Sequence, residues 1–301
     1  MPTIHTRPAC RLFVFLARDA PIGIIFRHGP ARLTQLILWH TDTDTFEPGD
    51  RHVGNFYAER GDLSPAGKLL IYVAANYTAR QCNHGLPNIW TALCKPPWLT
   101  PLAIWPNNEP YYIGGLFASN TTVQINQAPY AHEEWTQHKQ GMPAGQPPQE
   151  LEFQYDNLLW NPNNQFFTRL IRNGWKPIEP TPQPQIFDIA LEKAHPMRPQ
   201  TLVLMMGHQN TPTYEVRDPQ RKTMTPLPGA IWADWDQGGR LVYAQEGKLF
   251  TADVGVSGKL TPQEIADFTP TDRKRAHAPA NAGQWQVSRP IDGSCRASGP
   301  L

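Results

Sequence analysis

The sequence has 301 residues, with 27 Lys and Arg against 26 Asp and Glu, and it contains 32 prolines, 22 glycines and 10 tryptophans. This length suffices for one large domain with a sizeable core, and the balanced charge argues against nucleic acid or an anionic membrane as a partner. Prolines are spread through the chain and leave little room for long helices. We therefore expect an all-β protein in which helix is nearly absent.

The cysteines and apolar runs give an expectation for the compartment. The four cysteines are Cys10, Cys82, Cys94 and Cys295. They form no CxxC pair and show no spacing of zinc type, which favours free thiols in the cytosol. Arg18, Asp19 and Pro21 interrupt the apolar stretch 12–26, so this stretch is predicted as two strands and not as a signal sequence. No run approaches the roughly 18 apolar residues of a membrane-spanning helix, and the sequence predicts a soluble, cytoplasmic protein.

Short apolar runs predict most of the strands in the first half of the chain. Three successive runs, which indicate a meander, lie at 11–17, 22–27 and 33–40. Further strands are expected at 68–74, 89–94, 102–105, 114–117 and 121–126. Residues 128–150 are polar and are predicted to form a loop or a disordered insertion, with a mobile lid as the functional alternative.

The apolar runs in the second half of the chain are less regular. The runs 156–160 and 166–172 flank Asn161-Pro162-Asn163-Asn164 and predict a hairpin. A short helix is expected only at 187–194. Strands are then predicted at 202–206, 213–217, 241–244 and 248–250, the last two around a turn at Gln245-Glu246-Gly247.

Part of the last hairpin repeats an earlier segment. DLSPAGKLLIY, which begins at Asp62, lies over the stretch that begins at Asp234, with Gly67 on Gly239 at a separation of 239 − 67 = 172 residues. At roughly 43 residues per repeat, this separation equals about four repeat steps. Asp62 and Asp234 are equivalent, and each is expected to accept hydrogen bonds from the backbone of the turn that follows it.

These units combine a Pro- or Asp-rich turn, a glycine, a basic residue and an aliphatic-Tyr strand, and they resemble the β-propellers of the WD-repeat and TolB-like kind. The resemblance also extends to a group of uncharacterised bacterial propeller-like proteins, through DLSPAGKLLIY, PPWLTPLAIWP, GGLFASNTTVQIN and WADWDQGGRLVYAQEGKLF. It covers about residues 9–285. It implies an all-β fold, a propeller of five to six blades, and no particular activity.

The domain limits follow from this resemblance and from composition. We expect one propeller-like domain at 9–287 and a disordered tail at 288–301, where small polar residues dominate. A propeller must join its ends, so strand 11–17 is expected to pair in the same sheet as the hairpin at 241–252. Pairing of the N- and C-terminal strands would then close the ring.

Residues with catalytic or metal-binding chemistry form no compact motif. Asp42, Asp44 and Asp50 could supply oxygen ligands for a calcium-type ion, but they lack the remaining pattern of an ion loop. No metal is expected, and no cofactor, because no glycine-rich phosphate loop is present. The histidines next to strand ends are His28, His40, His84 and His208. No catalytic residue is assigned: these four are the least poor candidates, and a solvated loop histidine is the favoured interpretation of each.

The tryptophans divide into two groups. Those in or beside strands are predicted to fill space between sheets. They are Trp39, Trp90, Trp105, Trp160 and Trp232. Trp98 and Trp135 lie in loops, are expected to be exposed, and are candidates for binding a partner.

The sequence therefore predicts a cytoplasmic propeller that binds or scaffolds another protein, an inference from the fold alone. The alternative is a propeller enzyme, a hydrolase or lyase, with acid and base groups that converge at the central channel. A deep central pocket with two ionisable groups in hydrogen-bonding reach would favour the enzyme. A flat or aromatic rim would favour the scaffold.

Overall fold

The structure is a computed structural model. It describes residues 10–77, 88–107, 113–126, 151–156, 162–182, 187–207, 211–254, 259–270 and 276–284. Strands make up 54% and helix 5% of this part, so the prediction that helix is nearly absent is confirmed. The predicted insertion at 128–150 and tail at 288–301 lie outside the described residues.

The first sheet is the predicted antiparallel meander. Its strands, in spatial order, are β1 (Arg11–Leu16), β2 (Ile22–His28), β3 (Leu33–His40) and β4 (Thr45–Val53). Alternate side chains of β1 point to opposite faces, as in any strand. Leu12 and Val14 join the core cluster shared with the last sheet, whereas Phe15 joins the cluster shared with the second sheet.

The second and third sheets follow along the chain. The second contains β5 (Asn55–Phe56), β7 (Leu70–Ala75), β8 (Ile89–Cys94) and β9 (Pro101–Asn107), with β6 (Asp62–Leu63) also paired to β7. A 3-10 helix, η1 (Ala58–Arg60), lies between β5 and β6. The third contains β10 (Gly115–Phe117), β11 (Thr122–Asn126) and β12 (Glu152–Asp156), and its last two strands are parallel.

The fourth and fifth sheets complete the described structure. The fourth contains β13 (Lys176–Pro177), β14 (Phe187–Ala194), β15 (Thr201–Gly207), β16 (Pro212–Asp218) and β17 (Thr223–Pro226). The fifth contains β18 (Trp232–Trp235), β19 (Leu241–Gln245), β20 (Lys248–Val254) and β21 (Leu260–Asp267). The helix α3 (Pro162–Arg172) precedes the fourth sheet.

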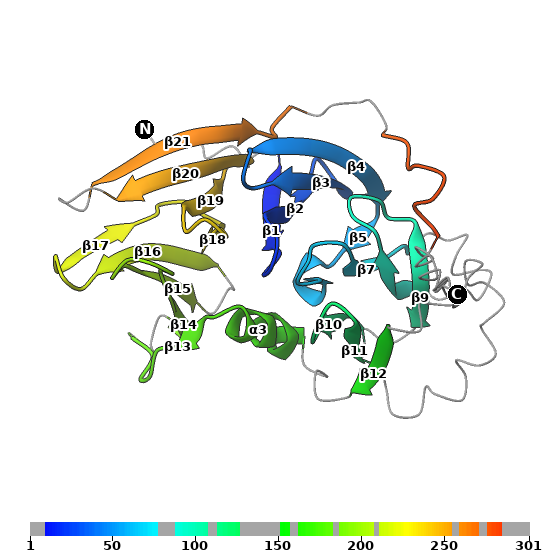
Figure 1. Ribbon diagram of the computed structural model, residues 1–301, viewed down its shortest axis with the longest axis horizontal. Coiled ribbons are helices and arrows are strands. Elements are labelled where there is room, and N and C mark those ends of the chain that lie inside the picture. Colours follow the sequence, from blue (N-terminus) through cyan, green and yellow to red (C-terminus); the bar gives the residue numbers. More distant parts are fainter. Residues whose placement is uncertain are drawn as a thin grey trace, which may run out of the picture.

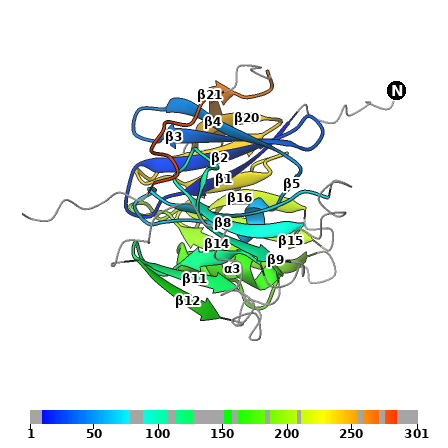
Figure 2. The ribbon, with the colours of Figure 1, turned by 90° about the vertical axis from the view of Figure 1, so that its right-hand side faces the viewer.

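The sheets stand around a common centre in a propeller-like arrangement (Figure 1). Four of them are antiparallel and have four or five strands, as propeller blades do, and α3 lies beside the small third sheet. Figure 2 shows the same sheets from the side, with the first sheet at one end and β11 and β12 at the other. The described structure therefore supports four blades, and the predicted five to six are not found. The prediction assumed equal repeats, but α3 and short strands occupy the region between the third and fourth sheets.

Closure by strand pairing is wrong for the described residues. β1 pairs with β2, and no strand joins it to β19. Side chains of the first and fifth sheets meet instead, in a cluster that includes Leu12, Trp39, Val242 and Leu249. The two sheets are also linked by Gln237 Nε2, which donates to the backbone carbonyl of Ala17, just after β1, at 2.7 Å. Face packing, not a shared ladder, joins these two sheets.

The internal repeat is confirmed as a repeated turn. Gly67 and Gly239 have φ values of 71° and 78°, in the left-handed region that glycine adopts without strain. Gly247, in the predicted turn between β19 and β20, has φ 80° and follows Glu246 at 51°. In both halves of the repeat, a glycine turn leads into the second strand of its sheet.

The acceptors of these turns differ from the prediction. Ser64 Oγ accepts two backbone N–H groups of its turn at 3.0 and 3.1 Å, and Asp236 Oδ1 accepts two at 2.8 and 3.0 Å. These positions are also 172 residues apart. Asp62 and Asp234 lie two residues earlier and contact cationic side chains instead, as described below.

Two further predictions are wrong. The expected hairpin at 156–172 contains α3, which begins at Pro162, a residue favoured in the first turn of a helix, and is followed by Gly174 with φ 93°. The expected short helix at 187–194 is strand β14, paired with β15 along its length. Among the described residues, no helix is long and apolar enough to cross a membrane.

Candidate functional site

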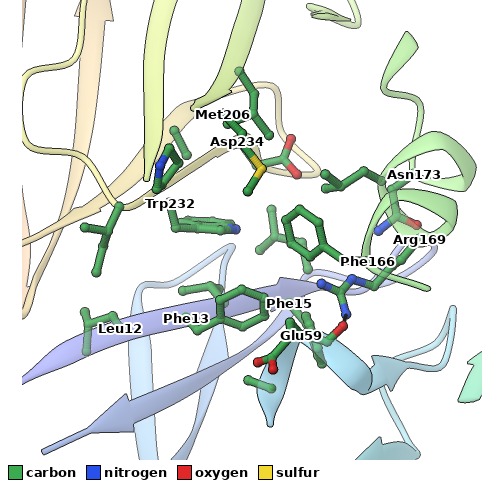
Figure 3. Close-up of a pocket in the computed structure, with 18 of the residues that line it drawn as sticks. Leu12, Phe13, Phe15, Glu59, Phe166, Arg169, Asn173, Met206, Trp232 and Asp234 are labelled. Atoms are coloured by element: carbon green, nitrogen blue, oxygen red, sulfur yellow. Dashed lines mark hydrogen bonds between the residues drawn. The ribbon is translucent and has the colours of Figure 1, made fainter. Parts of the chain in front are cut away.

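A central cavity of about 780 Å³ lies between β1, η1, α3 and the inner strands of the fourth and fifth sheets (Figure 3). This volume falls within the roughly 300–1,000 Å³ typical of small-molecule sites. Its walls come from distant parts of the chain, because four of the five sheets and the helix α3 contribute lining residues. The cavity is therefore the leading candidate for a functional site.

Eight Phe, Tyr and Trp side chains line the cavity. They are Phe13, Phe15, Phe56, Phe166, Phe167, Trp175, Tyr214 and Trp232. Phe13 contacts Phe15 edge to face, with ring centroids 5.5 Å apart, and lies 6.5 Å from Phe166 of α3. Trp232 lies across from these rings, next to Met206 (Figure 3). Such a wall favours a ligand with a flat apolar body.

Two tryptophan side chains line the cavity. Trp175 is only 1% exposed, and its Nε1 has no hydrogen-bond partner among the described residues. The indole nitrogen of Trp232 points into the cavity (Figure 3). A buried donor without an acceptor costs about 1–3 kcal/mol. An acceptor atom of a bound molecule would remove this cost.

Arg169 places a buried cation in the same wall. It is 4% exposed, and its Nη1 donates to the backbone carbonyl of Glu59 at 3.2 Å and to that of Gly61. Its guanidinium carbon lies 4.3 Å from the ring centroid of Phe15 and 5.4 Å from that of Phe166, within cation–π range. Burial lowers the pKa of Arg169 to about 10, so the side chain is still charged at neutral pH.

The cavity also contains two carboxyl groups, on Glu59 and Asp234. They lie on opposite sides of the cavity (Figure 3). Asp234 Oδ1 accepts from Lys193 Nζ at 2.6 Å and from the backbone N–H of Trp235 at 2.8 Å. The two carboxyl groups therefore stand on different walls of the cavity, and the one on Asp234 is already paired with a lysine.

Among the four candidate histidines, only His28 is found at the cavity. Its Nδ1 lies 2.9 Å from Thr34 Oγ1. Burial, assisted by the charge of Arg11, lowers the pKa of His28 to about 4, so the imidazole is neutral at pH 7. His40 instead contacts Glu47 at 2.7 Å on the surface. His84 and His208 lie outside the described residues.

The neutral state of His28 makes stability depend on pH. The unfolded chain binds a proton at this residue near pH 6.5, whereas the native protein does so only near pH 4. The contribution is therefore complete above about pH 6.5 and is lost as the pH falls towards 4, by up to about 3 kcal/mol. Urea unfolding at pH 7, 5.5 and 4 should show this loss, and His28→Asn should reduce it. Parallel losses in the two proteins would contradict the prediction.

The aspartates considered as metal ligands have structural partners. Asp44 accepts from Arg240 Nη1 and Nη2 at 2.8 and 3.0 Å and from Trp39 Nε1 at 3.1 Å. Asp50 accepts the backbone N–H of Leu99 at 2.9 Å. In the described part of the chain, no three His, Cys, Asp or Glu side chains gather as a metal site would require. These contacts give Asp44 and Asp50 roles in joining segments of the fold.

The tryptophans follow the prediction in part. Trp39, Trp105 and Trp232 are buried, as expected for side chains between sheets. Trp90 is partly buried against the core of the second sheet, and Trp160 is not described.

The two loop tryptophans give no partner site in the structure. Trp98 is half-buried, and Trp135 lies outside the described residues. Binding of a partner through Trp98 and Trp135 stays a prediction.

Sequence reasoning missed most of the cavity. Trp232 was predicted only to fill space, whereas Arg169 and Phe166 were assigned to a strand and Trp175 to its end. One signal pointed towards a helix: Gln165 and Arg169, polar residues four apart, lie on one helical face. Both are buried in the structure.

The fold and the cavity together define the class of protein, a propeller-like all-β protein with an aromatic central cavity. No protein-family model and no curated protein matches the sequence. The resemblance to WD-repeat and TolB-like propellers and to bacterial propeller-like proteins thus stays a prediction beyond its propeller-like fold.

Proposed function

We propose that this protein acts by binding, and that a small organic molecule with a flat apolar or aromatic body occupies the central cavity. The observation that carries the proposal is the wall of eight aromatic side chains around a cavity of about 780 Å³. Burial of an aromatic body against such rings is favourable by roughly 25 cal/mol per Å² of apolar surface. The indole donor of Trp232, which points into the cavity, would fix its orientation.

Binding accounts for the charged groups better than catalysis does. Asp234 is held by Lys193, and Glu59 lies on the opposite side of the cavity. The sequence favoured a protein as the ligand. A cavity of this volume accepts a small molecule but not a folded surface, so we place the small molecule in the cavity. A protein partner remains a separate prediction for the loop tryptophans.

A neutral aromatic probe tests this proposal. Phenylnaphthylamine fluoresces strongly only in apolar surroundings, and the native protein should bind it saturably. Met206→Trp places a larger side chain in the cavity, next to Trp232 (Figure 3), and should weaken binding roughly tenfold or more. Met224→Trp is the matched control, because Met224 is on β17 of the same sheet and is 68% exposed.

The control should bind the probe like the native protein. Equal binding by Met206→Trp, native and control proteins would place the probe elsewhere and contradict the proposal. Circular dichroism and melting curves of both variants would show that they retain the native fold.

A further inference from the structure

Arg169 is a buried cation with no carboxylate in contact. Within the described residues, its hydrogen bonds both start from Nη1 and both end on backbone carbonyls. Among the same residues, the Nε and Nη2 atoms of Arg169 make no hydrogen bond. Taking a charged side chain out of water is costly unless an opposite charge compensates it. The structure provides rings around Arg169, but no contacting counter-ion.

The nearest acid in its surroundings is already engaged. Asp62 is held by Arg172 through two hydrogen bonds, Nη1 to Oδ2 at 2.5 Å and Nη2 to Oδ1 at 2.8 Å. Asp62 also accepts the backbone N–H of Phe117 at 2.7 Å. Arg18 lies in the same charge cluster, since its pKa is lowered by burial and by Arg172. Asp62 is thus shared by Arg18, Arg169 and Arg172. Asp19 and Glu59 also act on this cluster through their charge, but among the described residues no carboxylate oxygen accepts a hydrogen bond from Arg169.

A purely structural role does not account for this charge. Arg169 ties α3 to the segment around η1, but Gln165, one turn earlier, makes the same kind of contact with a neutral amide. Gln165 Nε2 donates to the backbone carbonyls of Arg60 at 2.6 Å and Gly115 at 2.9 Å. A neutral donor is thus sufficient to hold the helix. The guanidinium adds charge and further donors at the cavity wall.

We propose that the ligand of the cavity is an aromatic anion, whose carboxylate, sulfonate or phosphate group binds Arg169. This inference rests on the proposed function and adds the charge of the ligand. The rings of the ligand would lie against Phe13, Phe166 and Trp232, which the close-up shows around the same space (Figure 3). The indole N–H of Trp232 would donate to an acceptor of the ligand. A planar guanidinium suits the two oxygens of a carboxylate.

Two probes with the same aromatic skeleton separate the charge from the apolar body. Anilinonaphthalene sulfonate is anionic, and phenylnaphthylamine is its neutral counterpart. At low salt and neutral pH, the native protein should bind the anionic probe at least roughly tenfold more tightly. Equal or weaker binding of the anionic probe would overturn the inference, while binding of the neutral probe would still support the proposed function. If the native protein binds neither probe, both the proposed function and the inference of an anionic ligand are wrong.

Two variants test whether Arg169 causes the preference for the anionic probe. Arg169→Met should remove the preference for the anionic probe and keep binding of the neutral one, which reports an intact cavity. Glu59→Gln removes a negative charge from the cavity and preserves the backbone carbonyl that Arg169 contacts. It should strengthen binding of the anionic probe several-fold and leave the neutral probe unchanged.

Each variant can contradict the inference on its own. An anionic preference that survives in folded Arg169→Met would overturn the assignment to this residue. If Arg169→Met does not fold, Glu59→Gln tests the inference instead. An unchanged ratio of the affinities for the anionic and the neutral probe in this variant would show that charge at the cavity does not affect binding. Arg221→Met, at an ion pair with Asp218 outside the cavity lining, is the control for loss of an arginine and should keep the native ratio.

Discussion

Asp62→Ala should destabilise the protein by about 3–5 kcal/mol, the cost typical of leaving a buried charge without its partner. Asp62 is 2% exposed and is the carboxylate that holds Arg172. Its removal would leave Arg172 beside Arg169 and Arg18 without the carboxylate that it contacts. It would also remove the acceptor of the Phe117 backbone N–H, so the contact between the second and third sheets would weaken. Chemical denaturation at pH 7 measures the loss.

Two further variants test whether the unpaired charge of Arg172 causes the loss of stability. The double variant Asp62→Ala, Arg172→Met removes both charges and should recover part of the loss, because no unpaired cation remains at this pair. Glu264→Gln breaks the exposed pair with Lys248 and should cost at most about 1 kcal/mol. A double variant no more stable than Asp62→Ala would show that the loss comes from packing and not from charge.

The strands of the first sheet and of the last hairpin were predictable because each has a local signature. The apolar runs that become β1, β2 and β3 alternate with turn residues, and the glycine turns at Gly67 and Gly239 recur at a fixed separation. Both signals depend only on neighbouring residues. The sequence therefore predicted the meander, the repeat and the last hairpin correctly.

Helix α3 was not predictable in the same way. Its residues Phe166 to Ile171 are as typical of a strand as of a helix, and the outcome depends on distant partners. Gln165 and Arg169 find their acceptors in carbonyls of the η1 segment, more than 100 residues earlier in the chain. No local pattern shows that those carbonyls are available. The same reason hid the cavity, whose walls come from five separate stretches of sequence.

The number of blades and the way in which the ring closes were predicted wrongly for a related reason. The repeat fixes the separation of two turns, but not what the intervening chain builds. Between them, β11 and β12 pair in parallel and α3 takes a place beside this small sheet. Closure was predicted from the absence of an earlier strand, whereas the first and fifth sheets meet through Trp39, Val242 and their neighbours.

Removal of residues 1–18 should cost the protein its native fold. This deletion takes away β1, and with it Leu12, Val14 and Phe15, which are 2%, 3% and 5% exposed. At about 1.5–3 kcal/mol for each fully buried side chain, their burial contributes roughly 5–9 kcal/mol. Net stabilities are only about 5–15 kcal/mol. The loss would also uncover the hydrogen-bonding edge of β2 and one wall of the central cavity.

An uncovered strand edge next to apolar side chains promotes association between chains. We therefore expect the shortened protein to be recovered as aggregates, visible by size-exclusion chromatography and light scattering. Removal of residues 1–8 only, which lie outside the described residues, leaves β1 in place and should keep the native melting temperature. A soluble protein without residues 1–18 that melts like the native one would show that the first and fifth sheets do not depend on β1. Their contact would then rest on β2 and β3, through Ile25, Ile37 and Trp39.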